Sequence, residues 1–421
     1  MSKYTKPEKS WMMYDMANSA YSIVITTAIF PIYYKAVADN AGVDSADSTA
    51  YLGYTISIAT FILAMLGPIL GSVADFKGMK RKFFLFFFLL GTLSTIGLVF
   101  VPSDNWLLLL IVYTLTAIGA RGANLFYDAY LVDVTEKKNM DDLSAKGFAI
   151  GYIGSVIPFV ISIAVITLSQ MEILPLSVTA ASKIAFFITA VWWIVFSIPM
   201  LKNVKQKHWV ERKPRIVANS FKELKKTFLD ITQHKAILIF LIAYFFYIDG
   251  VGTIISMSTA YGSDVGLGAT DLIIALLAVQ VVAAPFAVLF GRLANKFGAK
   301  RMIYAGIIIY TFVCTYALFL ETVLDFWILA MLVASAQGGI QALSRSYYAQ
   351  MVPKEKSNAF FGFYNIFGRF AAVTGPFLVG LTSQLTGNSS YGVFSLIILF
   401  VIGFIVLLFV PDHQAQNRKA A

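Results

Sequence analysis

The stretch that decides the fold is Gly71-Ser-Val-Ala-Asp75-Phe-Lys-Gly78-Met-Lys80-Arg81-Lys82, which lies between two long apolar runs. It returns later in the chain as Gly291-Arg-Leu-Ala-Asn295-Lys-Phe-Gly298-Ala-Lys300-Arg301. The glycine, alanine, lysine and arginine positions of the two copies match at one constant offset. Such an offset indicates one module made twice, so the sequence predicts two pseudo-symmetric halves.

The repeated loop contains an acid that needs a partner. Asp75 ends an apolar run and should lie at a helix C-terminus, where the backbone dipole disfavours an anion. The partner is either Lys80 or Arg81 nearby, or the N-terminus of a helix from the other half. Because the second copy has Asn295, any charged contact would be asymmetric. The loop either only sets topology or also clamps the two halves together. The residues of such a latch are Gly71, Asp75, Gly78, Lys80, Arg81, Gly291, Gly298 and Arg301.

The composition excludes a soluble protein. Hydrophobic residues make up 58% of the chain, charged residues only 13%, and the mean hydropathy is +0.74. No soluble domain can bury so much apolar surface, so the chain is an integral membrane protein with the lipid bilayer as a partner. The net charge of +10 does not indicate nucleic-acid binding, because Lys and Arg gather in the termini and every second loop. This positive-inside pattern predicts that both termini are cytoplasmic.

The sequence contains no motif for covalent chemistry. Its one cysteine, Cys314, lies in an apolar run, and its three histidines form no metal-binding pattern. We find no nucleophile–base set and no nucleotide-binding loop, so we expect no enzyme activity, no cofactor and no metal. An ion gradient is therefore the expected energy source, with protons as the coupling ion.

Apolar segments of spanning length divide the chain into an all-α membrane protein with twelve predicted helices. They cover 11–38, 50–74, 83–101, 106–132, 144–168, 183–201, 236–262, 270–294, 302–321, 326–350, 357–383 and 391–411. The first half is then 1–201, the second 236–421, and the basic stretch 202–235 is a cytoplasmic linker. Within the linker, Phe221, Leu224, Phe228 and Ile231 share one helical face, which predicts an amphipathic helix on the membrane surface.

Polar residues inside the apolar segments form stripes on four of the helices. The ionisable ones are Asp15, Arg121, Asp128, Asp249, Arg345 and Arg369. The stripes are Asp15, Asn18, Ser22 and Thr26; Arg121, Asn124 and Asp128; Asp249, Thr253 and Ser256; and Gln337, Gln341, Ser344 and Tyr348, with Arg345 at the edge. These are the first, fourth, seventh and tenth helices, which are symmetry mates. Charges in a bilayer tend to face a cavity or a partner, so the stripes predict one central cavity; isolated Ser and Thr can equally join helices.

We assign provisional roles to this set. The predicted substrate-binding residues are Arg121, Asn124, Asn18, Tyr14, Gln337, Gln341 and Thr253. The predicted proton-coupling acids are Asp249 near the midplane, and Asp15 and Asp128 toward the cytoplasmic end. Arg121 and Asp128 are seven residues apart, about 10.5 Å along a helix, which is long for an ion pair. The partner of Arg121 is therefore either an acid of another helix, Asp15 or Asp249, or the carboxylate of the substrate.

Four stretches in order resemble one family. They begin at Trp11-Met-Met-Tyr14-Asp15-Met-Ala-Asn18, Ser144-Ala-Lys-Gly147-Phe148, Tyr247-Ile-Asp249-Gly250 and Gln337-Gly-Gly-Ile-Gln341. They are similar to the vacuole-effluxer family, a branch of the major facilitator superfamily, whose loop between helices two and three the 71–82 stretch also resembles. The resemblance implies twelve helices in two six-helix halves, alternating access and export of amino acids. The absence of long inserts fits a bacterial plasma (inner) membrane protein.

The sequence thus predicts a monomeric, multi-pass, proton-coupled exporter of amino acids or similar small zwitterions. Paired Arg and Asp residues in the predicted cavity favour a zwitterion over a hydrophobic cation. One alternative keeps the fold and changes the cargo to drugs or lipids. Another is a receptor or scaffold that no longer transports.

Overall fold

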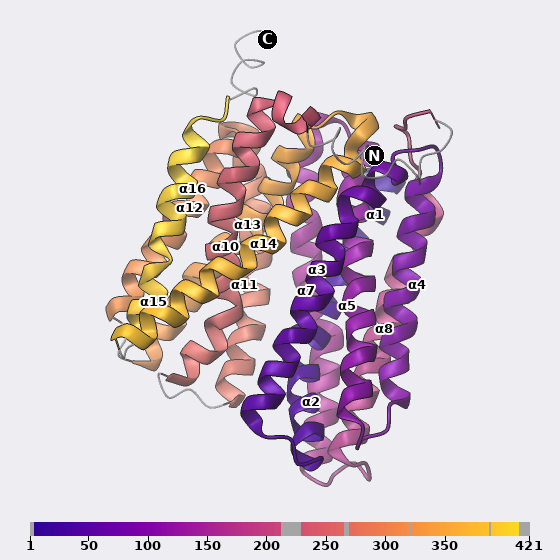
Figure 1. Ribbon diagram of the computed structural model, residues 1–421, viewed down its shortest axis with the longest axis vertical. Helices are drawn as coiled ribbons and strands as arrows, with labels where there is room; N and C mark the ends of the chain where they lie inside the picture. Colours follow the sequence, from indigo (N-terminus) through magenta and orange to yellow (C-terminus); the bar gives the residue numbers. More distant parts are fainter. Residues whose placement is uncertain (1–3, 212–228, 265–268, 320–321, 387–388, 412–421) are drawn as a thin grey trace.

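The computed structural model describes residues 4–211, 229–264, 269–319, 322–386 and 389–411, and these residues are almost entirely helical (Figure 1). The first group of helices is α1 (Lys6–Tyr21), the π-helix η1 (Ser22–Ala28), α2 (Ile29–Asn40), α3 (Ser45–Ala74), α4 (Met79–Phe100), α5 (Trp106–Ala129), α6 (Leu131–Val134), η2 (Lys137–Asn139), α7 (Met140–Gln170) and α8 (Val178–Asn203). The second is α10 (Lys235–Asp264), α11 (Ala269–Phe297), α12 (Ala299–Tyr316), η4 (Ala317–Phe319), α13 (Val323–Met351), η5 (Lys354–Lys356), α14 (Ser357–Thr386), α15 (Ser389–Ser395) and α16 (Ile397–Leu408).

The predicted all-α membrane fold is confirmed. Among the described residues, 11 helical segments are long and apolar enough to cross a membrane. The remaining predicted segment, 357–383, is α14, which has 30 residues and is therefore about 45 Å long. The first segment is longer than predicted and runs from Lys6 to Asn40 through α1, η1 and α2. It starts early because Thr5 and Glu8 form a capping box at its N-terminus.

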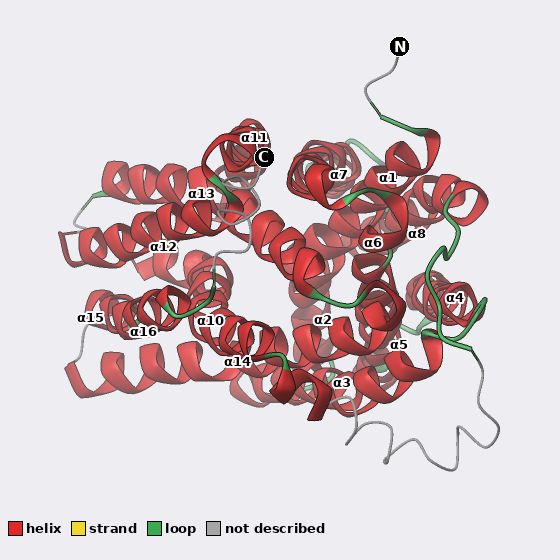
Figure 2. Ribbon diagram, turned by 90° about the horizontal axis from the view of Figure 1, so that it is seen from above, coloured by secondary structure: helices red, strands yellow, loops and turns green. Residues whose placement is uncertain are grey.

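The helices lie in two groups that contact each other along two seams. Figure 1 shows α1–α8 on one side and α10–α16 on the other, with α1 beginning and α16 ending at the same end of the molecule. Seen from above in Figure 2, α3 lies beside α14 and α7 lies beside α11, and both pairs are in contact. The α7 helix also contacts α13. These seams are where the two halves meet.

Small residues let the helices approach closely at both seams. Gly67 and Gly71 of α3 face Gly362 and the first residues of α14, and a Cβ on Gly362 would lie 2.8 Å from the Cα of Pro68. At the other seam Gly291 of α11 packs on Ala145 of α7. We call the end of the molecule that carries the loops 75–78 and 297–299 the latch side.

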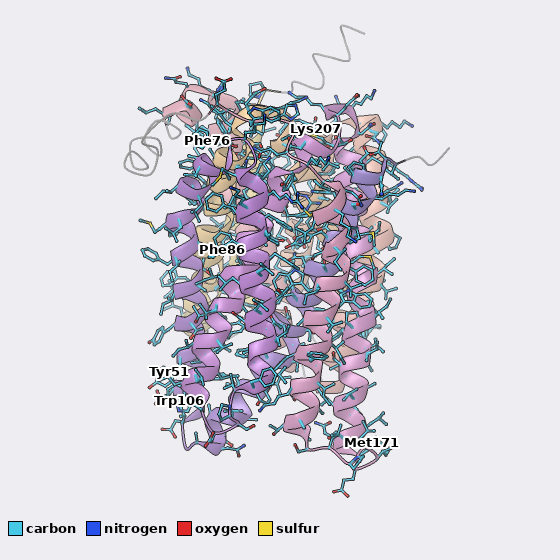
Figure 3. All side chains as sticks on the ribbon, turned by 90° about the vertical axis from the view of Figure 1, so that its right-hand side faces the viewer. Tyr51, Phe76, Phe86, Trp106, Met171 and Lys207 are labelled. Atoms are coloured by element: carbon cyan, nitrogen blue, oxygen red, sulfur yellow. The ribbon has the colours of Figure 1, made fainter. Side chains whose placement is uncertain are left out.

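The surface of the bundle is apolar, as a bilayer requires. Figure 3 shows Phe76 and Lys207 at the latch side and Trp106 and Met171 at the opposite end, with Phe86 between them. Large apolar side chains point outward over this middle zone; examples are Ile58, Phe61, Phe86, Phe312 and Phe377. At the end opposite the latch, Trp106 stacks on Tyr51 with ring centroids 5.2 Å apart. Aromatic rings at this level are typical of a membrane interface.

The described residues at the start of the linker form hydrogen bonds with the first latch loop. After α8 ends, the Val210 N–H donates to the Asp75 carbonyl at 2.9 Å, and Gln206 Oε1 accepts from the Gly78 N–H at 3.0 Å. Gly78 has a φ of 75°, a left-handed conformation that favours glycine. The predicted amphipathic helix lies mostly outside the described residues; of its apolar positions only Ile231 is described, and it is buried.

We expect the small residues of the α3–α14 seam to be necessary for stability. In the variant Gly71→Ala, the new Cβ would overlap the Asn358 carbonyl and lie 3.1 Å from the Cα of Ala359. Such overpacking costs about 1–3 kcal/mol, so the melting temperature of the purified protein should fall by several degrees. Gly53→Ala is the matched control, because it lies on the same helix and its Cβ would meet nothing within 4 Å. Equal melting temperatures for the two variants would contradict this interpretation.

Candidate functional site

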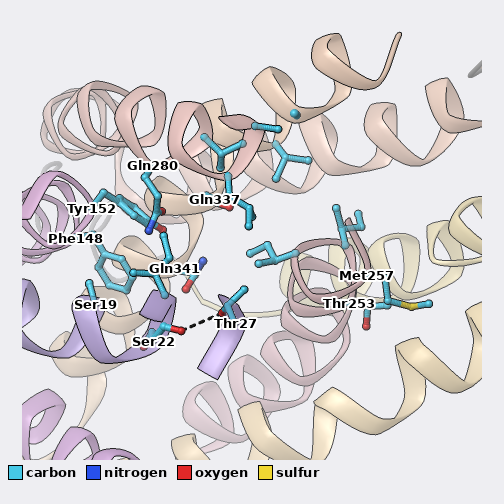
Figure 4. A pocket seen from close by; sticks show the side chains of 18 of the residues that line it. Ser19, Ser22, Thr27, Phe148, Tyr152, Thr253, Met257, Gln280, Gln337 and Gln341 are labelled. Atoms are coloured by element: carbon cyan, nitrogen blue, oxygen red, sulfur yellow. Dashed lines mark hydrogen bonds between the residues drawn. The ribbon is translucent and has the colours of Figure 1, made fainter. Parts of the chain in front are cut away.

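A cavity of about 450 Å³ lies between the two groups of helices (Figure 4). Side chains from α1, η1, α5 and α7 line one wall, and side chains from α10 to α15 line the other, together with Leu396. In Figure 4, Gln280, Gln337 and Gln341 cluster near Tyr152 and Phe148, while Thr253 and Met257 lie across the cavity. The cavity extends from Arg345 toward the end opposite the latch, where Phe326 and Leu396 line it.

Most of the predicted polar stripe residues line this cavity. They are Asp15, Asn18, Ser22, Asn124, Asp128, Thr253, Gln337 and Gln341. Tyr14, Arg121 and Asp249 are not among its lining residues. Residues that sequence reasoning did not assign to the site also line it, above all Arg345, together with Ser19, Phe148, Tyr152 and Gln280. The sequence signal for Arg345 was its place at the edge of the polar stripe on the tenth predicted helix.

The π-helix η1 changes which side chains of the first helix face the cavity. A π-turn has i→i+5 hydrogen bonds and so inserts a residue relative to an α-helix; here the Ile29 N–H donates to Val24 O. The predicted stripe ended at Thr26, but the structure has Thr27 lining the cavity, with its hydroxyl donating to Ser22 O at 3.0 Å. The stripe prediction was wrong at that position because it assumed an uninterrupted α-helix.

Arg345 is the centre of a charged cluster at the latch-side end of the cavity. Its Nη2 lies 3.3 Å from Asp15 Oδ2 and its Nη1 lies 3.2 Å from Asp128 Oδ1. Its Nε donates to Ser144 Oγ at 2.9 Å, and Nη2 also donates to the Ser144 carbonyl at 3.2 Å. The guanidinium thus bonds to α1, α5 and α7 at once, while its own backbone belongs to α13. The ion pairs join the two groups of helices.

Aromatic rings enclose the guanidinium. Its Cζ lies 4.6 Å from the ring centroids of Trp11 and Phe148, and 5.5 Å from that of Tyr127. These are cation–π distances, which are most favourable when water is excluded. Gly147 is required beside the cluster, because a Cβ there would run into the Asp15 carboxylate and lie 3.4 Å from Arg345 Nη2.

The three predicted site residues outside the cavity lining have other contacts. Tyr14 is fully buried and lies against Tyr127, with ring centroids 4.6 Å apart. Arg121 donates to the Thr60 hydroxyl and to the Ile56 carbonyl at 3.4 Å, so it reaches from α5 to α3. Their predicted roles in substrate binding and proton coupling remain predictions.

Asp249 is buried at the junction of α10 and α14. Its Oδ2 accepts from the Gly375 N–H at 2.8 Å and its Oδ1 accepts from the Thr253 hydroxyl at 3.4 Å. Gly375 permits this approach, since a Cβ there would overlap Thr253 and Asp249. No cation contacts Asp249 among the side chains that the structure describes, which do not include that of Arg369.

At the first latch loop, Asp75 contacts the N-terminus of a helix from the other half, which is one of the two partners that the sequence predicted. Its carboxylate accepts from the Asn358 N–H at 2.9 Å, the Asn358 side-chain amide at 2.8 Å and the Ala359 N–H at 3.1 Å. Helix N-termini favour anions because their first N–H groups are free and their dipole is positive. The acid of α3 therefore caps α14 across the seam.

Lys80 also contacts the N-terminus of α14, beside the residues that Asp75 contacts. It is completely buried, and its Nζ lies 2.6 Å from Asp133 Oδ2 and 3.1 Å from Ser357 Oγ. The Asp133 carboxylate also accepts from the N–H groups of Lys207 and His208, both at 2.9 Å. Arg81 is exposed. The loop, α6, the linker and α14 are thus tied together.

The second copy of the loop has different contacts. Lys300 donates to the Val410 carbonyl at 2.5 Å, within its own half, and Arg301 is exposed. Gly298 has a φ of 98° and begins α12. The acid at this seam lies on the α7 side instead: Asp141 accepts from Ser346 at 2.5 Å and from Gln350 at 2.8 Å. The two seams are therefore related in packing but not in charge.

Burial raises the pKa of Asp75 to about 7, although Lys80 and the N–H donors of Asn358 and Ala359 act in the opposite direction. The side chain is only 3% exposed. Within the described ranges, no group of three or more His, Cys, Asp or Glu side chains is arranged to hold a metal ion.

Two helix groups that meet at glycine-rich seams around a central charged cavity define a membrane transporter of the major facilitator type. Solved structures of this type have the same fold. The human organic anion transporter MFSD10 has a TM-score of 0.73 at 12% identity, covering 97% of this chain and 100% of that protein. The proton:xylose symporter XylE has a TM-score of 0.74 at 13% identity, covering 96% and 95%.

The chain belongs to the vacuole effluxer Atg22-like family, whose model matches residues 5–138 and 132–420. It is 62% identical over 417 residues to the uncharacterized MFS-type transporter YxiO of Bacillus subtilis, covering 99% of this chain and 97% of YxiO. It is also 23% identical to autophagy-related protein 22 of Vanderwaltozyma polyspora, covering 89% and 80%. The predicted family and fold are confirmed, and the chain is a transporter and not an enzyme.

Asp75 should make thermal stability depend on pH near neutrality. Its pKa is about 7 in the folded protein against an ordinary value of 3.8, so between these values the folded state binds more protons than the unfolded state. Stability should therefore rise as the pH falls through about 7, by at most about 1.4 kcal/mol per pH unit from this group. Melting temperatures of wild type and Asp75→Asn, measured from pH 8 to pH 5, should show a smaller rise in the variant. Parallel curves would contradict the assignment.

Proposed function

We propose that the chain is a proton-coupled secondary transporter that exports amino acids or similar zwitterions across the plasma membrane by alternating access. The observation that carries this proposal is the content of the cavity. One end has a guanidinium beside carboxylates, from Arg345, Asp15 and Asp128, with the amides of Asn18, Asn124, Gln337 and Gln341 nearby. Both charges of a zwitterion have a complementary group there.

The rest of the cavity suits an apolar side chain. Much of the wall contributed by the second half is aliphatic or aromatic; examples are Ile254, Leu276, Val279, Val313, Phe326, Leu329 and Val333. A pocket with a few polar groups at one end and apolar walls elsewhere binds one end of a ligand by hydrogen bonds and the other by burial. An amino acid with an apolar side chain fits both ends. A lipophilic drug would contact only the apolar wall of the cavity.

Proton coupling is supported by the charge balance of the cluster. One guanidinium, that of Arg345, faces two carboxylates, those of Asp15 and Asp128. With both acids ionised, the cluster has one excess negative charge inside the bilayer, where charge is costly. A proton bound to either acid removes it. Asp249 is a second candidate, because its carboxyl is buried and its described partners are a backbone N–H and the hydroxyls of Thr253 and Thr374.

The orientation follows from the positive-inside pattern. The basic loops and linker lie on the latch side, so we place that side, both termini and the 202–235 segment in the cytoplasm. The cavity then extends toward the outside, and the described conformation is closed to the cytoplasm. The fold relative FucP, a fucose:proton symporter of E. coli, was also solved in an outward conformation. In this proposal a monomer works through its halves, 1–201 and 236–421, moving about the cavity.

The transport proposal is tested with purified protein in liposomes. Radiolabelled L-leucine should accumulate when a pH gradient is imposed, and unlabelled leucine on the opposite side should support exchange. In Asp249→Asn, gradient-driven accumulation should fall at least about tenfold while exchange remains, because only the coupled step needs the proton. Asp325→Asn, at the far end of α13, is the matched control. Wild-type accumulation in Asp249→Asn contradicts this role, and displacement of cargo only by lipophilic cations contradicts the zwitterion.

Topology is tested separately. Fusions of an enzyme that is active only outside the cytoplasm, placed after Val410 and within 202–235, should be inactive, and a fusion in the loop between α4 and α5 should be active. The expected contrast is at least about tenfold, since translocated and retained reporters differ in folding. An active C-terminal fusion would contradict the orientation.

A further inference from the structure

Arg345 holds the two halves together at the floor of the cavity. Its backbone belongs to α13 of the second half, while its partners Asp15, Asp128 and Ser144 belong to the first. The Ser144 hydroxyl also donates to the Ala342 carbonyl of α13 at 2.8 Å. A passage from the cavity to the latch side cannot form while these bonds remain.

Breaking the ion pairs in an empty cavity is unfavourable. The side chains of Arg345 and Asp15 are only 5% and 8% exposed, and that of Asp128 is 17% exposed. Separating such a pair leaves an uncompensated charge in a medium of low dielectric constant. The separation becomes feasible only if another group takes over each charge.

A zwitterion brings replacement charges for Arg345 and Asp128, and a proton on Asp15 neutralises the remaining acid of the cluster. A carboxylate can accept two parallel hydrogen bonds from a guanidinium, which here means the Nη1 and Nη2 edge now shared by Asp128 and Asp15. An ammonium can donate to Asp128, the most exposed member of the cluster and a lining residue of the cavity. Trp11, Phe148 and the Ser144 contacts hold the guanidinium plane in position for this exchange.

We propose that Arg345 binds the carboxylate of the substrate and Asp128 binds its ammonium, and that in the empty carrier these two residues neutralise each other across the halves. Only the occupied carrier can then open on the latch side. The inference rests on the proposed function for the class of substrate. It assigns to Arg345 the role that the sequence suggested for Arg121, whose described bonds go to Thr60 and Ile56 of α3.

The test measures the distance between spin labels across the latch side. Labels at Lys82→Cys and Glu355→Cys, both exposed positions, report separation of the halves in a Cys314→Ala background. Without ligand, the wild type should give one short distance, and millimolar L-leucine should add a longer one. Neither 4-methylpentanoate, which lacks the ammonium, nor 3-methylbutylamine, which lacks the carboxylate, should do so.

The variants separate the two parts of the proposal. Arg345→Gln should give the longer distance without ligand, whereas Arg292→Gln, an exposed arginine of α11, should behave as the wild type. Asp128→Asn preserves the shape of the site and provides a second variant if Arg345→Gln folds poorly. In Asp128→Asn, leucine binding should weaken at least about tenfold, and 4-methylpentanoate should bind as well as leucine.

Three results would overturn the proposal. A closed latch side in ligand-free Arg345→Gln contradicts the ion-pair contact, whatever the substrate is. Loss of leucine binding in Arg121→Gln but not in Arg345→Gln would mean that Arg121, and not Arg345, binds the substrate carboxylate. If Arg345→Gln opens but no amino acid affects the wild type, the contact between the halves is supported, while the two ligand assignments fail together with the proposed substrate class.

Discussion

The structure depends on how a buried arginine is neutralised inside a membrane. Arg345 cannot be left without counter-ions in a medium of low dielectric constant, and its counter-ions are on helices of the other half. This requirement brings α1, α5, α7 and α13 to one point. The glycines around the point, such as Gly147, follow from it, because the helices must approach closely enough for a guanidinium to reach two carboxylates and a serine. The cavity begins where this cluster ends.

Two kinds of contact hold the halves together, and they differ in symmetry. The small residues at the α3–α14 and α7–α11 seams repeat between the halves, as Gly71 and Gly291 do. The charges do not repeat. At one seam Asp75 at the end of α3 caps α14, and at the other Asp141 at the start of α7 accepts from α13. The small residues therefore repeat between the two seams, while the polar contacts differ.

The sequence predicted the features that depend on local pattern and failed where a partner comes from another helix. Hydrophobic length and the repeated loop predicted the helices and the two halves, and polar stripes placed Asp15, Asn18, Gln337 and Gln341 around one cavity. The partner of Arg345 could not be read from spacing, since Asp15 and Asp128 lie far away in sequence. Asp249 likewise accepts from the backbone of α14, which no side-chain pattern reveals. The register of the first helix beyond Ser22 was missed because nothing in Ser22–Ala28 distinguishes a π-turn from an α-turn.

That π-turn has a consequence for the far end of the same helix. The extra residue rotates everything after it by about 100° relative to an uninterrupted α-helix. This rotation directs Phe30 toward Tyr113 and Phe186. The Phe30 ring stacks on that of Tyr113 with centroids 4.1 Å apart, and its centroid lies 6.1 Å from that of Phe186. Along this one segment, the part before the π-turn therefore directs carboxylate and amide groups toward the cavity, and the part after it packs aromatic rings within its own half. Deleting one residue from this turn would therefore misplace either the polar side chains before it or the aromatic rings after it.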